Sequence, residues 1–173
     1  MNTEPQSTNP IEIMSNVAEG FAFGNFMDLP LAEMLKSSGL DFSVSSLSVI
    51  DGYLQAVHES LPKAKSGARN ISMLPSASQQ ALVLRIGAYV GEVIRRSAEP
   101  DTYRWLNHAE TVARFPEHQA TLGRQPTLLT AYAIATADGQ ILLPLNRVFK
   151  ALADGPVNST LEFAKTVSQA VAS

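Results

Sequence analysis

Residues 82–94 read LVLRIGAYVGEVI, and this stretch decides the predicted fold. At 100° per residue, a helix gathers most of its apolar side chains on one broad face. These side chains are Leu82, Val83, Ile86, Tyr89, Val90, Val93 and Ile94. With Gly87 and Gly91 beside them, they cover about half of the circumference, which is wider than a surface helix needs. We therefore predict a central helix over 76–97 that other elements contact on two sides.

The two glycines on this helix predict a close approach by another backbone. Gly87 and Gly91 are one helical turn apart, so they lie one above the other. Residues 128–136 alternate as a strand does, and one face of that strand would carry Leu129, Ala131, Ala133 and Ala135. We expect this alanine face to cross the central helix at its glycines.

Helix signals also precede the central helix. Asn9 can cap a helix that has Pro10 at its first position, and Gly20 is expected to end it. Further helices are predicted over about 30–39 and 43–61.

Strand signals follow the central helix. Residues 103–107 alternate around Trp105, and Asp138-Gly139 is typical of a tight hairpin turn after the strand at 128–136. The return strand is expected over 141–145, where Pro144 indicates a sheet edge or a strand end. Residues 108–126 show no clear pattern.

The last elements are again helical, over 147–153 and from Asn158 or Ser159 onward. The order of helices, then strands, then helix favours an α+β fold. We predict a single α+β domain at 9–173 after a disordered tail at 1–8. Its helical N-terminal half, including an N-terminal arm at 9–40, packs on a small antiparallel sheet and is closed by a C-terminal helix.

The composition excludes several classes of protein. The 173 residues carry a net charge of −3 and no basic cluster of the kind that binds a phosphate backbone. With no cysteine, disulfides, thiolate catalysis and cysteine-ligated zinc are excluded. No signal-type segment or membrane-length apolar run is evident. We expect a cytoplasmic, soluble protein with no cofactor that binds neither nucleic acid nor membrane.

The segment 87–96 resembles a helix found in a group of uncharacterised bacterial proteins, a domain of unknown function. In that group a Gly-x-Tyr-x-Gly-Glu helix precedes a tryptophan strand, a proline-containing hairpin and a closing helix. The matching positions here are Trp105, Pro144 and the turn at Gly155-Pro156. The resemblance covers about 45–165 and implies a fold and a bacterial origin, but no activity.

Glu92 is the strongest catalytic candidate, with Arg85, Tyr89 and Trp105 as neighbours of a binding pocket. It precedes Arg95 and Arg96 by three and four residues, which is the favourable order for helix ion pairs. We favour an ion pair at the surface or rim over a general acid–base role, because that role requires burial and a shifted pKa.

Two further groups admit alternative interpretations. His108, Glu110, Glu117 and His118 lack a recognised ligand spacing, so we predict no metal site. Phe21, Phe23 and Phe26 either fold back onto the domain, which we favour, or form an interface with a partner chain.

No nucleophile elbow and no phosphate-binding loop occurs in the sequence. Together with the low charged fraction of 17%, this favours a non-enzymatic protein-interaction module, an adaptor or immunity-type binder. Its partner would be another protein or itself, as a homodimer. The alternative is a small-molecule-binding protein or enzyme with its pocket near Arg85, Tyr89, Glu92 and Trp105.

Overall fold

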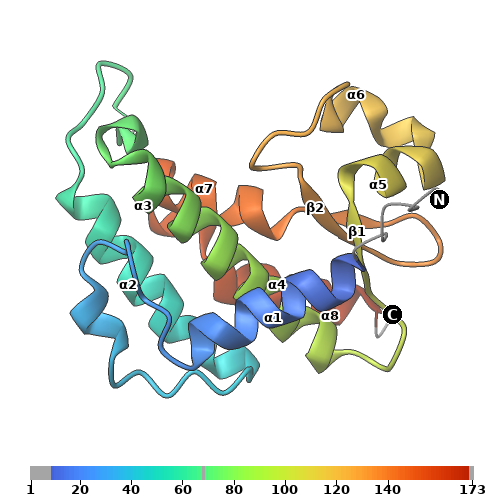
Figure 1. Cartoon of the computed structure of the whole chain (residues 1–173), viewed down its shortest axis with the longest axis horizontal. Helices are drawn as coiled ribbons and strands as arrows, with labels where there is room; N and C mark the ends of the chain where they lie inside the picture. The colour runs from blue at the N-terminus through green and yellow to red at the C-terminus, as the bar shows by residue number, and fades with distance from the viewer. Residues whose placement is uncertain (1–8, 68, 172–173) are drawn as a thin grey trace, which may run out of the picture.

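A computed structural model describes residues 9–67 and 69–171 and has the predicted α+β architecture. Helix α4 (Gly87–Ser97) runs through the middle of the molecule and contacts α1 (Pro10–Ala22), α7 (Pro144–Asp154) and α8 (Thr160–Val171). The strands lie beyond one end of this helical body, together with two short helices (Figure 1). The predicted tail at 1–8 lies outside the described residues.

The central helix is one continuous rod with a π-helical turn in it. Helix α3 (Ser76–Ala81) passes into the π segment η4 (Leu82–Ile86) and then into α4, so the predicted span of 76–97 is confirmed. Every residue from Ile86 to Ile94 is buried, on all sides of the helix. A π turn holds an additional residue, so it rotates the side chains before it relative to those after it.

The glycines of α4 permit close packing as predicted, but the predicted partner is wrong. An added Cβ at Gly91 would lie 2.2 Å from the indole of Trp105, and one at Gly87 would lie 2.9 Å from Leu145 Cα. The Trp105 indole and the start of α7 therefore fill the space that the two glycines leave beside α4. The atoms nearest an added Cβ at Gly87 and Gly91 belong to Leu145, Trp105 and Pro144 and not to the alanine face.

The N-terminal third is less regular than predicted. Asn9 caps α1 by accepting a hydrogen bond from Ile11 N at 3.1 Å, as expected. Gly20 does not end this helix, which continues to Ala22. Only the single 3-10 turn η1 (Ala32–Leu35) forms within 30–39. After the 3-10 turn η2 (Val44–Ser46), α2 (Leu47–Ser60) forms where a helix was predicted.

The sheet is antiparallel with strand order β1-β2-β3. Strand β1 (Arg104–Asn107) pairs with β2 (Tyr132–Ala135), which pairs with β3 (Ile141–Leu142). Both hairpin strands are shorter than predicted. The return strand ends at Leu142 because Pro144 is the first residue of α7.

The region 108–126, for which the sequence shows no clear pattern, is mostly helical as far as Leu122. It forms α5 (His108–Arg114), the 3-10 turn η5 (Pro116–His118) and α6 (Gln119–Leu122). Asn107 and Glu110 form a reciprocal capping box at the start of α5, with bonds of 2.8 and 3.0 Å. The sequence pattern Asn-x-x-Glu at 107–110 is typical of a capping box and predicts a helix start here.

Two 3-10 turns complete the chain, η3 (Ile71–Met73) before α3 and η6 (Pro156–Asn158) before α8. Ser159 caps α8 by accepting from Glu162 N at 3.0 Å, as predicted. One apolar core cluster draws its members from Met14 on α1 through to Val167 on α8. Among the helices within 9–67 and 69–171, none combines the length and apolar character needed to cross a membrane.

Candidate functional site

The carboxylate of Glu92 is completely buried, and each of its oxygens accepts two hydrogen bonds. Oε1 accepts from Arg95 Nε at 2.7 Å and from Trp105 Nε1 at 2.9 Å. Oε2 accepts from Arg95 Nη2 and Arg96 Nε, both at 2.9 Å. A carboxylate has about four acceptor sites. Glu92 therefore has no acceptor capacity left for a substrate.

Glu92 is ionised in the folded protein. Burial alone would raise its pKa, but the hydrogen bonds from Arg95, Trp105 and Arg96 outweigh burial and hold the pKa below its ordinary value. Its predicted partners are therefore correct, while its predicted place at the surface is wrong: its side chain is 0% exposed. A carboxylate whose acceptor sites are all filled and whose pKa is lowered is a poor general acid or base.

The ion pair continues into a wider polar and aromatic network. Arg96 Nη2 donates to Glu19 Oε1 on α1 at 2.8 Å, and its guanidinium lies 3.9 Å above the Phe42 ring. Phe42 contacts the ring of Tyr89, whose hydroxyl accepts from Phe42 N at 3.1 Å and bonds Ser46 Oγ at 2.6 Å. These contacts connect α1, the 42–46 turn and α4.

The four residues of the predicted pocket do not converge. Glu92 and Trp105 are bonded to each other, whereas Arg85 donates to the backbone oxygens of Asn25 and Met27. Tyr89 is buried and faces the 42–46 turn. Trp105 borders one cavity, but Arg85, Tyr89 and Glu92 border none of the three cavities described next.

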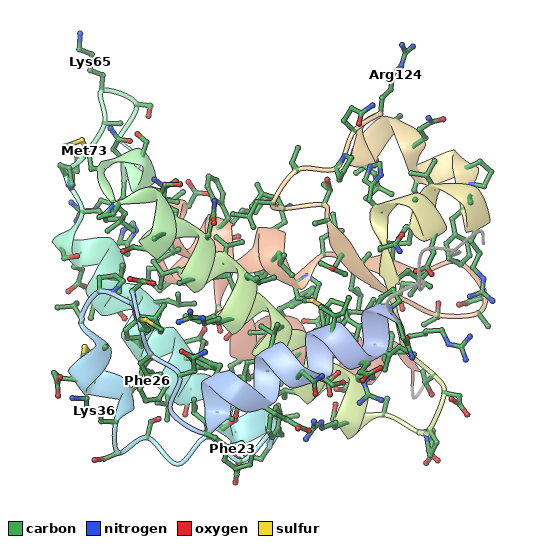
Figure 2. All side chains as sticks on the ribbon, viewed as in Figure 1. Phe23, Phe26, Lys36, Lys65, Met73 and Arg124 are labelled. Atoms are coloured by element: carbon green, nitrogen blue, oxygen red, sulfur yellow. The ribbon has the colours of Figure 1, made fainter. Side chains whose placement is uncertain are left out.

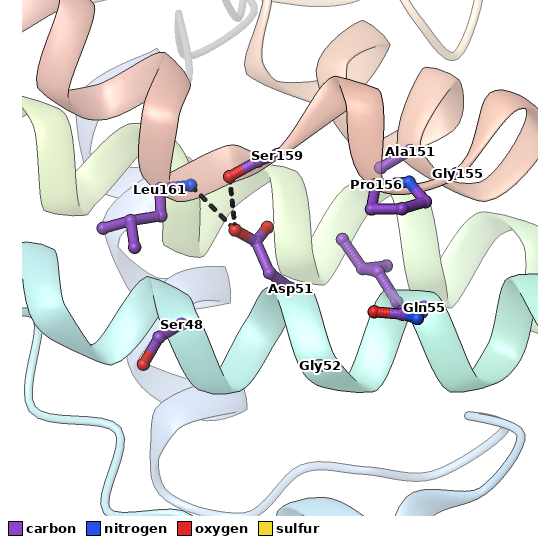
Figure 3. Close-up of a pocket in the computed structure, with 10 residues that line it drawn as sticks. Ser48, Asp51, Gly52, Gln55, Ala151, Gly155, Pro156, Ser159 and Leu161 are labelled. Atoms are coloured by element: carbon purple, nitrogen blue, oxygen red, sulfur yellow. Dashed lines mark hydrogen bonds between the residues drawn. The ribbon is translucent and has the colours of Figure 1, made fainter.

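The cavities on the described surface include three of about 270 to 440 Å³. One of about 440 Å³ lies between the start of α1 and the sheet, bordered by Trp105, Arg104 and Arg114. Another of about 270 Å³ lies between β3, α7 and α8. The third, of about 330 Å³, lies between α2 and the α7–α8 connection (Figure 3).

The histidines bind backbone carbonyls. His108 Nε2 lies 3.2 Å from Gly123 O, His118 Nε2 lies 3.1 Å from Gly139 O, and His58 Nδ1 lies 2.8 Å from Leu152 O. Glu110 caps α5, and Glu117 Oε1 lies 4.0 Å from His118 Nε2, beyond hydrogen-bond distance. Within 9–67 and 69–171, no three His, Asp or Glu side chains gather in a way that would hold a metal ion.

The three phenylalanines at the end of α1 separate into two groups. Phe21 is fully buried and packs edge-on against Tyr89 and Phe26, with ring centroids 5.6 Å apart in both pairs. Phe26 is half-buried against the core. Folding back is therefore confirmed for Phe21 and Phe26. Phe23 instead points away from the molecule and is 86% exposed (Figure 2).

Phe23 begins a segment with an unusual concentration of exposed apolar side chains. Met27 is 68%, Leu31 45% and Met34 51% exposed, so four large apolar residues of the 23–34 segment face solvent. Elsewhere in the described chain, Met73 and Val157 are exposed singly. The sequence analysis missed Met27, Leu31 and Met34. These residues and Phe23 recur at steps of three and four, as on one helical face, but the segment forms turns and one 3-10 turn instead of an α-helix, so the spacing alone does not define the surface.

Buried anchors hold the 23–34 segment in place. Leu29 within it and Leu35 just after it are buried. Tyr53 donates its hydroxyl proton to Pro30 O at 2.6 Å, and Arg85 holds the backbone at Asn25 and Met27.

Comparisons of this chain with models of protein families, with curated proteins and with solved structures find no match. The resemblance noted in the sequence therefore remains a prediction.

Proposed function

We propose that this protein is a non-enzymatic bacterial interaction module, an adaptor or immunity-type binder, and that it binds its partner through the 23–34 segment. The observation that carries the proposal is the exposure of Phe23, Met27, Leu31 and Met34 from one short segment. Single exposed apolar residues are normal on a protein surface, but a concentration of them is typical of an interaction site.

The chemistry of these side chains supports a protein partner. Aromatic residues and methionine are enriched in the cores of protein–protein interfaces. Methionine is flexible and polarisable, so Met27 and Met34 can adapt to an uneven apolar surface. The nearby charges of Glu33 and Lys36 are paired with each other at 2.7 Å, so the net charge of the segment is that of Asp28 alone.

The backbone of the segment also supports a functional role. Asp28 and Leu31 have φ values of 66° and 53°, in the left-handed region that non-glycine residues avoid. Each such residue costs about 1–2 kcal/mol. This strain persists because Leu29, Leu35 and the bonds from Tyr53 and Arg85 fix the segment. A segment fixed in advance loses less conformational entropy when it binds.

Glu92 gives no support to an enzyme at the predicted pocket. Its oxygens are filled by Arg95, Arg96 and Trp105, and its pKa is lowered. The proposal therefore rests on the surface of the 23–34 segment and not on the buried network.

Site-directed photo-crosslinking tests the proposal. A photoreactive phenylalanine analogue is placed at Phe23 or, as a matched control, at Val157, which is 81% exposed on another part of the surface. We expect an adduct in bacterial cells from position 23 and none from position 157. The mass of the adduct distinguishes a second copy of the chain from another protein.

A double variant, M27S/M34S, shows whether the crosslink depends on the apolar surface. It should abolish the adduct from position 23 without lowering the melting temperature, because both side chains are exposed. Equal crosslinking from positions 23 and 157, or no adduct from position 23, would contradict the proposal.

A further inference from the structure

The cavity between α2 and the α7–α8 connection has features that the fold itself does not require. Its volume is about 330 Å³, near the lower end of cavities that bind small molecules. The apolar part of its lining consists of Leu54, Ala151, Pro156 and Leu161. In Figure 3, Gly52 and Gln55 on α2 lie across from Ala151 and Pro156.

Gly52 is the unexpected residue in this lining. It lies in the interior of α2, where glycine is unfavourable compared with alanine. A Cβ added at Gly52 would meet nothing within 4 Å, and its φ is not in the left-handed region. Neither packing nor backbone geometry within the molecule therefore accounts for glycine at this position. Because glycine has no side chain, the α2 wall of the cavity carries no side-chain atoms at this position.

The charges at the cavity are already compensated. Asp51 is the only ionisable residue in the lining, and its carboxylate accepts hydrogen bonds from Thr160 N at 2.7 Å and Leu161 N at 3.2 Å. It also accepts from the hydroxyls of Ser159 and Thr160, and it interacts electrostatically with Arg147. The cavity therefore offers no free charge to attract an ionic ligand.

Gln55 supplies one polar group with unused capacity. Its amide nitrogen donates to Glu59 Oε1 at 2.9 Å, while its amide oxygen accepts no bond from the described residues. We propose that this cavity binds a small, uncharged, mainly apolar molecule with one hydrogen-bond donor. Its ring or chain lies against Gly52 and the apolar lining, and its donor bonds Gln55 Oε1. This site is independent of the proposed protein-binding segment.

Phenol, a ring with a single O–H donor, is a suitable probe. We expect saturable changes in the amide NMR signals of α2 and of residues 151–161, with a Kd on the order of 1 mM. Anisole has the same ring but no donor, and it should bind several-fold more weakly. The Q55M variant should remove this difference between phenol and anisole.

Gly52→Met fills the cavity from the α2 wall with a residue that favours helix, so the variant is expected to fold. It should weaken phenol binding at least about tenfold. The matched control is Gly20→Met, because Gly20 also lies in a helix, has open space around an added Cβ and does not line this cavity. That variant should bind phenol as the unchanged protein does.

Three results would overturn the proposal. One is the absence of saturable signal changes up to about ten times the expected Kd. Another is equal weakening of phenol binding by Gly52→Met and Gly20→Met. The third is a set of signal changes that lies outside α2 and 151–161.

Discussion

Glu92 is a buried charge whose removal affects several neighbours. It bonds Arg95, Arg96 and Trp105 at once. Replacing it with glutamine removes the negative charge and leaves a single acceptor oxygen for Arg95, Arg96 and Trp105, although Arg96 keeps its bond to Glu19. Breaking a buried ion pair costs about 3–5 kcal/mol, and the partial exposure of the two arginines lowers this value.

We therefore predict that E92Q lowers the free energy of unfolding by about 2 kcal/mol at neutral pH. Urea denaturation followed by circular dichroism measures this change. E33Q is the control, because the Glu33–Lys36 pair is exposed and should contribute less than about 1 kcal/mol. Equal losses of unfolding free energy in E92Q and E33Q would show that burial of Glu92 does not strengthen its ion pairs.

The effect of E92Q should depend on pH. The pKa of Glu92 lies below its ordinary value of 4.5 in the folded state. A lowered pKa stabilises the protein above the unfolded pKa, and this stabilisation is lost as the pH falls through the folded value. The difference between the unchanged protein and E92Q should therefore shrink as the pH falls below about 4.5. A difference that stays constant over this range would mean that Glu92 has the same pKa in both states.

Gly91 is required by the side chain opposite it. A Cβ at this position would overlap the Trp105 ring, which Glu92 holds by a hydrogen bond. We predict that G91A destabilises the protein by about 1–3 kcal/mol, as overpacking does. G20A, in open space, should be neutral or stabilising by up to about 1 kcal/mol. Thermal unfolding of both variants measures this contrast, and an unchanged melting temperature for G91A would refute the packing argument.

Helix α8 depends on a residue of α2 for its start. Asp51 accepts from the backbone N–H groups of Thr160 and Leu161, which no residue within α8 can satisfy. A negative charge at this end also interacts favourably with the helix dipole. The last helix therefore begins where the tertiary fold places Asp51.

We predict that D51A destabilises the protein by about 2 kcal/mol, the upper end of the range for a lost cap. Amide hydrogen exchange should show reduced protection first in α8, before α2 changes. D154A is the control, because Asp154 is an exposed residue at the end of α7, and it should change stability by less than about 0.5 kcal/mol. Uniform loss of protection across the chain would argue against a local capping role.

The whole molecule has one principal core, drawn from α1 through α8. A shared core favours unfolding in a single cooperative transition. Trp105 is the only tryptophan. It is a buried residue of β1 that packs against Gly91 of α4, so its fluorescence reports on the contact between the sheet and α4.

We predict that tryptophan fluorescence and far-ultraviolet circular dichroism give the same urea midpoint. Fluorescence reports the contact between the sheet and α4, and circular dichroism reports mainly the helices. Two separate midpoints would show that the sheet region and the helical body unfold independently. That result would contradict the prediction of a single domain over 9–173.

Local sequence signals determined the helices and turns that depend on nearby residues. The helix at 76–97, the caps at Asn9 and Ser159 and the turn at Asp138-Gly139 could all be predicted. Each of these signals acts over a few residues. The same signals predicted the ion-pair partners of Glu92, because helix geometry alone sets that spacing.

The tertiary structure decided which side chains meet across long sequence separations. It buried Glu92 under Trp105, placed the indole rather than an alanine strand against Gly91, and left Phe23 outside while Phe21 turned inward. It also left Gly52 facing a cavity. Burial and contact depend on how elements pack together, and no local pattern of residues specifies that packing.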